Sequence, residues 1–366
     1  MAPLVRHADG AGCQVQVMTT SQSPDFHLNR PGVLIAALPA VLGFVPEKSL
    51  VLVTVERGEM GCVMRVDLSD ELPDSLEHIA DVAAAAQPDA AIAVVVDENG
   101  FGCPTCADEH RQLAAVLSTA LAEQGIELLA AHVVDRVAVG GRWYCADGCG
   151  ASGAVEDPSA SPLAMAAVLD GRRLYARRAE LQEVIEVSDP ARRTALADVV
   201  RDRRPEGDER GDAEARSDIE DAIAAAGQVD GGGELSDHEL ARLAWALKDP
   251  RVRDTLYALA VGENAAQAEA LWATLSRTLP DPWRVEALVL LAFSAYVRGD
   301  GPLAGVSLDA ALHCDPTHRM AGMLDTALQS GMRPERIREL AVTGYRLADQ
   351  LGVRLPPKRA FGRRAG

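Results

Sequence analysis

The sequence predicts an α/β domain, with a mixed and mainly parallel sheet that has helices on both faces, followed by an all-α region. Apolar segments of strand length alternate with helical segments in the first half of the chain, which is typical of parallel strands buried on both faces. The later part of the chain shows helical periodicity only. At 366 residues the chain is long enough for two domains with separate cores.

Composition divides the chain into five segments. Residues 1–23 are small, polar and aperiodic, which predicts a disordered tail. A mixed α/β domain that contains paired cysteines is expected over residues 24–200. Residues 201–235 are mostly acidic and end near three consecutive glycines, which is typical of a linker. The helical region is expected over residues 236–350. Residues 351–366, which contain several basic side chains and no acidic ones, are expected to form a loose tail.

The elements of the α/β domain follow from periodicity and turn residues. Pro31 suits the first turn of a helix, and Gly43 suits its end. A hairpin is expected next, because two apolar segments flank a short charged turn. The elements expected are strands at 49–55 and 60–68, a helix at 74–86, a strand at 90–96, a helix at 108–124, a strand at 127–134, a hairpin at 137–144 and a helical stretch at 163–201.

Two closely spaced cysteine pairs are the most specific chemical feature. Cys103 and Cys106 are separated by Pro-Thr, and Cys145 and Cys149 are separated by Ala-Asp-Gly. In a chain without an export signal, such pairs are typical of a tetrahedral zinc site, in which each thiolate reaches the ion at about 2.3 Å. Four thiolates would leave no open coordination position, so this zinc would be structural.

The predicted sheet brings the two pairs together. The loop with Cys103 leaves the carboxyl end of strand 90–96. If residues 140–141 form a two-residue turn, Cys145 lies opposite Arg136, just past the same edge of the sheet. The topology therefore predicts one zinc site shared by both pairs.

Two alternatives stay open for these cysteines. One pair could be ordinary reduced thiols. Alternatively, Cys103 and Cys106 could form a redox-active disulfide, because Cys106 lies just before a predicted helix and a helix N-terminus lowers the pKa of a thiol. Cys62 and Cys314 are expected in the core.

A second candidate site lies where predicted strands end. Asp67, Asp97 and Asp135 each follow a strand, and Arg65 shares a sheet face with Asp67. If these strands are parallel, the acids gather at the edge where open α/β sheets bind ligands. The commoner role of such residues is to turn the chain or to cap the next helix, so a ligand site here is an alternative to that role.

Other functional classes lack their signatures. The net charge of −18 argues against a general nucleic-acid binder. The most apolar segment, residues 33–45, is too short to cross a membrane and contains Pro39, and the N-terminus lacks the apolar core of a signal peptide. There is no phosphate-binding loop and no Gly-x-Ser-x-Gly nucleophile motif. We therefore expect a cytoplasmic protein with no membrane or nucleic-acid partner.

Residues 285–318 resemble a tetratricopeptide unit. Small and large residues fall at the spacings where the paired helices of that motif contact one another, and Gly299-Asp300-Gly301 supplies the turn. One clear unit is too few for a solenoid with a deep peptide groove. The region is expected to be either a packing scaffold or a surface for a protein partner.

Several segments together resemble one known family. They are residues 29–39 (NRPGVLIAALP), 42–46 (LGFVP) and 65–68 (RVDL), Arg142-Trp143 with Cys145 and Cys149, and parts of residues 241–316. These segments resemble the actinobacterial domain-of-unknown-function 4192 family, over about residues 26–340. The resemblance implies one architecture and an actinobacterial source, and it implies no activity.

The expected function is that of a non-enzymatic interaction or regulatory scaffold with a structural zinc site. One alternative is a hydrolase or small-ligand-binding domain that uses the acids at the sheet edge. The other is a thiol redox protein that uses Cys103 and Cys106.

Overall fold

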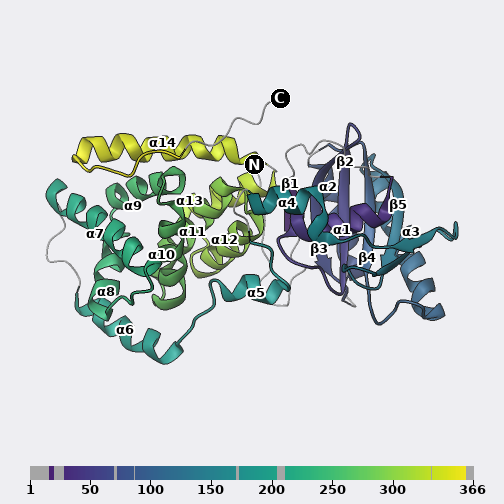
Figure 1. Cartoon of the computed structure of the whole chain (residues 1–366), viewed down its shortest axis with the longest axis horizontal. Helices are drawn as coiled ribbons and strands as arrows, with labels where there is room; N and C mark the ends of the chain where they lie inside the picture. Colours follow the sequence, from purple (N-terminus) through teal and green to yellow (C-terminus); the bar gives the residue numbers. More distant parts are fainter. Residues whose placement is uncertain are drawn as a thin grey trace. The chain divides into compact units, whose positions relative to one another are not determined.

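The protein is described here by a computed structural model, in which the chain divides into two compact units, Met1–Ala166 and Ala167–Gly366 (Figure 1). The structure describes residues 16–19, 29–69, 72–85, 87–169, 173–203, 211–330 and 332–359. Residues 167–200, expected in the α/β domain, belong to the second unit.

The first unit is built on a seven-stranded sheet with the order β1-β3-β2-β4-β5-β6-β7. The strands are β1 (Gln16–Thr19), β2 (Ser49–Glu56), β3 (Glu59–Asp67), β4 (Ala90–Val96), β5 (Glu127–Val134), β6 (Arg142–Cys145) and β7 (Ser152–Ala154). β1 lies within the segment expected to be a disordered tail, and the rest of that segment is outside the described residues.

The prediction of a mainly parallel sheet is wrong. Within the described residues only β4 and β5 pair in parallel, and every other neighbouring pair is antiparallel. The cause is the predicted β2–β3 hairpin, which closes through the left-handed residues Arg57 and Gly58. Its first strand, β2, lies between β3 and β4, so β3 and β4 point the same way without being neighbours.

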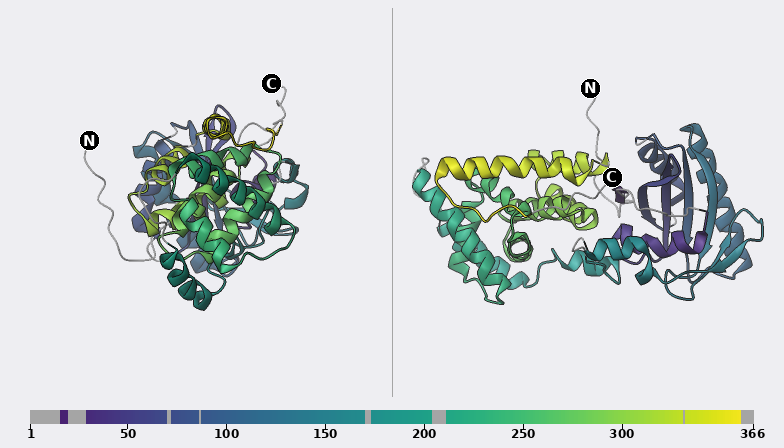
Figure 2. Two further views of the ribbon diagram at one scale, coloured as in Figure 1. Left: turned by 90° about the vertical axis from the view of Figure 1, so that its left-hand side faces the viewer. Right: turned by 45° about the horizontal axis from the view of Figure 1, so that its top comes forward.

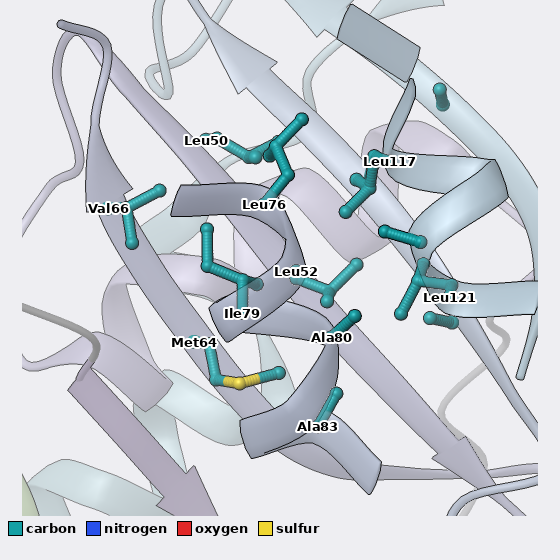
Figure 3. Packing of buried hydrophobic residues seen from close by; sticks show 14 of the residues in the cluster. Leu50, Leu52, Met64, Val66, Leu76, Ile79, Ala80, Ala83, Leu117 and Leu121 are labelled. Carbon is teal, nitrogen blue, oxygen red and sulfur yellow. The ribbon is translucent and has the colours of Figure 1, made fainter. Parts of the chain in front are cut away.

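Helices cover both faces of this sheet. On one face, α2 (Leu72–Ala84) and α3 (Pro104–Glu123) pack against apolar residues of the central strands. Figure 3 shows Leu76 and Ile79 of α2 beside Leu52 and Met64 of the sheet. This layer is the hydrophobic core of the first unit.

The other face carries α1 (Pro31–Leu42), in which most residues are buried. A Cβ at Gly32 would lie 2.4 Å from the carbonyl oxygen of Ala154 and 3.5 Å from Trp143 Nε1. Tyr144 packs into the α2–α3 layer, so the neighbouring Trp143 points to the opposite face and places α1 there. As predicted, Pro31 begins this helix and Gly43 ends it in a left-handed conformation.

The second unit is largely helical, with α14 along one side of it (yellow in Figures 1 and 2). The short helix η1 (Pro158–Ala160) belongs to the first unit, and α4 (Pro162–Leu169) spans the boundary between the units. The helices that follow are α5 (Arg178–Glu183), α6 (Pro190–Asp202), α7 (Asp212–Asp230), α8 (Asp237–Ala246), α9 (Pro250–Leu256), η2 (Tyr257–Val261), α10 (Ala265–Thr278), α11 (Arg284–Arg298), α12 (Gly301–Cys314), α13 (Arg319–Gln329) and α14 (Pro334–Leu351).

Two segments expected to be linker and tail take part in this unit. The acidic segment contains α7, whose Ala215, Ile219, Ala222 and Ala226 recur at helical spacing and are buried. Beyond α14, the backbone of Lys358 bridges to that of Gly262. Residues 204–210 and 360–366 lie outside the described residues.

The helix–turn–helix expected within residues 285–318 is present as α11 and α12. Gly299 ends α11 with a φ of 87°, and the side chain of Asp300 accepts a hydrogen bond from Leu303 N at 3.2 Å to cap α12. α11 is buried on every side from Val285 to Val297, so it is the central helix of the unit. Among the described residues, no helix combines the length and the apolar character that a membrane crossing requires.

Candidate metal centre and thiol pair

The turn that follows β6 gathers three metal-binding side chains. Cys145 is half-buried at the end of β6, and Asp147 and Cys149 are exposed in the turn. The Sγ atoms and a carboxylate oxygen of these residues all lie within 4.8 Å of one another. Tetrahedral zinc with Zn–S bonds of about 2.3 Å places two sulfurs about 3.8 Å apart, so small side-chain rotations would close this set around one ion.

The backbone of the turn holds these side chains on one side. The carboxylate of Asp147 accepts a hydrogen bond from Cys149 N at 2.9 Å, and Cys145 N donates to the carbonyl oxygen of Ala151 at 2.9 Å. Gly148 takes a φ of 78°, which a residue with a side chain rarely adopts. The hydrogen bonds from the Cys149 thiol and backbone lower the pKa of Asp147, so its carboxylate is ionised at neutral pH.

His132 of β5 lies beside Cys145 and outside the group of three donors. Its Nδ1 lies 3.4 Å from Cys145 Sγ, and only 4% of the residue is exposed. Burial lowers the pKa of His132, while the charge of Asp147 partly opposes this shift. The imidazole is therefore neutral at physiological pH, which is the form that binds metals.

The first cysteine pair opens helix α3. Cys103 is the N-cap residue and Cys106 lies in the first turn, and both are partly exposed free thiols. The backbone N–H of Cys106 and then its thiol stabilise the Cys103 thiolate and lower the pKa of Cys103. The same thiol–thiol hydrogen bond, together with burial, raises the pKa of Cys106 to about 11.

The structure does not bring the two pairs together. Cys145 lies opposite His132 in the β5–β6 ladder, two residues before the end of β5, instead of opposite Arg136 as expected. Tyr144 faces the α2–α3 layer, so Cys145 and His132 face the other side of the sheet, away from Cys103 and α3.

The physical reason is the loop before β6. β6 begins opposite the end of β5, and Gly141 packs against this loop so closely that a Cβ there would lie 2.2 Å from the carbonyl oxygen of Arg136. The loop is therefore longer than the two-residue turn that we expected. Within the described residues, the group that surrounds a common point is Cys145, Asp147 and Cys149, without Cys103 or Cys106.

The three predicted acids lie at one edge of the sheet, because Asp67 pairs with Ser49, Ser49 with Val96, and Val96 with Val134. Asp97 and Asp135 directly follow the last two residues of that row. β2 and β4 lie between the outer acids, so the three carboxylates are spread along the edge.

Each acid also has a local partner. Asp67 forms an ion pair with Arg65 at 2.5 Å. Asp135 accepts hydrogen bonds from the backbone N–H groups of Arg136 and Arg142 at 2.6 and 2.8 Å, which closes the loop before β6. These bonds fit the turn-forming role, and a ligand site at this edge stays a prediction.

Asp97 belongs to a row of polar side chains that also contains His110 and Tyr144. Its Oδ1 accepts a hydrogen bond from Gly100 N at 3.0 Å, and its Oδ2 lies 3.1 Å from His110 Nε2. His110 Nδ1 in turn lies 3.3 Å from the hydroxyl of Tyr144. This polar row lies beside Cys106, since a Cβ at Gly100 would approach both Asp97 Oδ2 and Cys106 Cβ.

Comparison with known proteins identifies the family. The model of the domain of unknown function DUF4192 matches residues 31–335. The chain belongs to the DUF4192 family. No curated protein and no solved structure matches it.

Two donors of this DUF4192 protein were missed by the sequence reasoning. Asp147 lies inside the second cysteine pair, where its spacing offered a signal that was not used. His132 offered no such signal, because its approach to Cys145 depends on the β5–β6 register. His110 was not among the predicted site residues, and it is only 6% exposed.

Proposed function

We propose that the protein is a non-enzymatic interaction scaffold whose first unit is stabilised by a structural zinc ion. The zinc would be held by Cys145, Asp147 and Cys149, with His132 as the fourth ligand. The single observation that carries this proposal is the convergence of three donor atoms within 4.8 Å in one short turn.

Several features support a structural and not a catalytic role for this zinc. Four protein ligands leave no open position for water or substrate. The site would also stabilise the β6–β7 end of the sheet, where β6 has four residues and β7 has three, all three of them exposed. A metal that joins β5, β6 and the following turn would compensate for this small buried area.

The second part of the proposal is that the helical unit contacts a protein partner. Large apolar side chains are exposed on α13 and α14, including Met323 at 58%, Val342 at 52% and Leu340 at 45%. The net charge of −18 disfavours a nucleic-acid partner. Comparison of the proteins captured by the wild-type chain and by a Met323→Glu chain tests this part.

Elemental analysis of the purified full chain tests the zinc proposal. We expect one equivalent of zinc in the wild type and its loss in Cys149→Ser. Cys103→Ser is the matched control, because it removes a thiol from the other face of the sheet and should keep the zinc. Absence of zinc from the wild type, or loss in the control of the same equivalent that Cys149→Ser removes, would contradict the proposal.

A further inference from the structure

The thiols of Cys103 and Cys106 form a second chemical site that the zinc proposal does not use. They lie at the start of α3, the helix that connects the parallel strands β4 and β5. A disulfide requires Cα atoms roughly 4.4–6.8 Å apart, and residues three apart in the first turn of a helix have a separation of this order. The position of the pair is therefore compatible with a disulfide bond.

We propose that Cys103 and Cys106 form a reversible disulfide by exchange with a disulfide substrate, with Cys103 as the attacking thiolate and Cys106 as the resolving thiol. Two cysteines at the start of a helix within a β–α–β unit are typical of this chemistry. The position of the pair on α3 assigns the roles, because Cys103 is the N-cap residue at the positive end of the helix dipole and Cys106 lies within the first turn. The pKa directions agree with this assignment, since the nearby backbone N–H and thiol of Cys106 lower the pKa of Cys103, whereas the Cys103 thiol raises the pKa of Cys106.

Asp97 and His110 give Cys106 a neighbouring proton acceptor. Asp97 is the half-buried partner of His110 at 3.1 Å, and the Asp97 carboxylate and the Cys106 side chain both pack against Gly100. His110 is one helical turn beyond Cys106 on α3. We infer that the Asp97–His110 pair accepts the proton of the Cys106 thiol when that thiol reacts. The other ionisable groups that act on this site are Tyr144, Glu109 and Arg111.

The thiol–disulfide exchange takes place in two steps. The Cys103 thiolate attacks one sulfur of the substrate disulfide, which forms a mixed disulfide and releases the first substrate thiolate. Cys106 then loses its proton to the Asp97–His110 pair and attacks Cys103 Sγ, which forms the Cys103–Cys106 disulfide and releases the second thiolate. The substrate gains two electrons and the protein loses two.

Relative alkylation rates test the assignment of roles. A pKa of about 11 for Cys106, against an ordinary 9.0, lowers its thiolate fraction at neutral pH about 100-fold relative to an ordinary thiol. The greater intrinsic nucleophilicity of a thiolate with a higher pKa offsets roughly half of this on a logarithmic scale. Iodoacetamide should therefore modify Cys103 at least about tenfold faster than Cys106, as measured by peptide mass spectrometry of the full chain.

Glutathione disulfide and a disulfide-bonded peptide serve as the two substrate probes. We expect the Cys103–Cys106 disulfide to form in the wild type with one or both probes. Cys106→Ser should accumulate a mixed disulfide at Cys103, and Cys103→Ser should form none at Cys106. Reaction with the first probe, the second or both identifies a small thiol, a protein or either as the source of the disulfide.

A matched pair of acid variants tests the Asp97–His110 pair. Asp97→Asn keeps the oxygen that accepts from Gly100 N but removes the charge, and it should slow the second step at least about tenfold while the first step stays unchanged. Glu98→Gln removes one charge from the next, exposed residue and should leave both steps unchanged. Equal effects of the two variants would overturn the role of Asp97.

Two results would overturn the thiol exchange itself. One is the absence of any Cys103–Cys106 disulfide with both probes in the folded wild-type chain. The other is a second zinc equivalent that is lost in Cys103→Ser, since this pair would then be a metal site. Neither result affects the zinc proposed at Cys145, so the two proposals fail separately.

Discussion

At the scale of single residues, the side chain of His318 joins a helix cap to a buried charge cluster. Its Nδ1 accepts a hydrogen bond from Ala321 N at 3.1 Å, which caps α13. Nε2 therefore carries the hydrogen and donates to Glu286 at 3.2 Å. Glu286 is only 4% exposed, and Arg253 and Lys248 approach it at 3.4 and 3.5 Å.

These contacts determine how Glu286 responds to acid. Burial alone would raise the pKa of Glu286, but the hydrogen bond from His318 and the charges of Arg253 and Lys248 outweigh it and lower the pKa. A carboxyl whose pKa is lowered by folding stabilises the fold above its unfolded pKa of about 4.3. That stabilisation is lost as the pH falls through the folded pKa.

We expect Glu286→Gln to destabilise the protein by about 3 kcal/mol at neutral pH, because it leaves Arg253 with one carboxylate partner fewer in a mostly buried site. The variant should also lose less stability than the wild type as the pH falls below about 4. Urea unfolding between pH 7 and pH 3 measures both effects.

The control variant Glu335→Gln removes an exposed partner of Arg338 and should change stability by less than about 0.5 kcal/mol. Equal losses of unfolding free energy in Glu286→Gln and Glu335→Gln would contradict a stabilising role for the buried Glu286 cluster.

At the scale of elements, Gly344 lets α14 approach η2 closely. A Cβ at Gly344 would lie 2.8 Å from the carbonyl oxygen of Thr255 and 2.9 Å from Ala258 Cβ. We therefore expect Gly344→Ala to destabilise the second unit by about 1–3 kcal/mol, although alanine is the better helix former.

Gly322 of α13 is the matched control for this change. In the described part of the chain, no atom beyond the adjacent residues and backbone of α13 lies within 4 Å of a Cβ built at Gly322, so Gly322→Ala should stabilise the protein by up to about 1 kcal/mol. Thermal unfolding of both variants gives the comparison. Stabilisation by Gly344→Ala would show that the close approach of α14 does not constrain this position.

The bounds of individual strands could be predicted from the sequence, but their order in the sheet could not. Strands β4 and β5 have the predicted bounds, β2 differs by one residue at one end and β3 by one residue at each end, because apolar segments between turn residues define a strand locally. Which strands become neighbours is a non-local property. The hairpin turn at Arg57 and Gly58 was visible, but nothing in the periodicity of β2 showed that it would separate β3 from β4.

The prediction that both cysteine pairs share one metal site was wrong for the same reason, although Cys145 and Cys149 were predicted ligands and do lie in the group of three. Side chains alternate between faces, so the direction of Cys145 depends on the register of β6, and the register depends on the length of the preceding loop. The sequence identified all four cysteines as chemically special. It could not show that the sheet separates Cys103 and Cys106 from Cys145 and Cys149.

At the scale of the whole molecule, the chain consists of two units with separate cores. The cysteine sites belong to the first unit, and the Glu286 cluster belongs to the second. Perturbations of residues that share no contacts are expected to be independent. The two units should therefore respond separately to loss of metal and to loss of a buried charge.

Differential scanning calorimetry of the full chain should show two transitions. We expect a zinc chelator to lower only the transition of the first unit, and Glu286→Gln to lower only that of the second. For units of this size, 1 kcal/mol shifts the midpoint by about 2–4 °C, so the loss of about 3 kcal/mol expected for Glu286→Gln corresponds to about 6–12 °C. Cys149→Ser is the control for the chelator, because it should abolish the chelator's effect while leaving the second transition in place. A single transition that moves with both perturbations would show instead that the two units unfold as one.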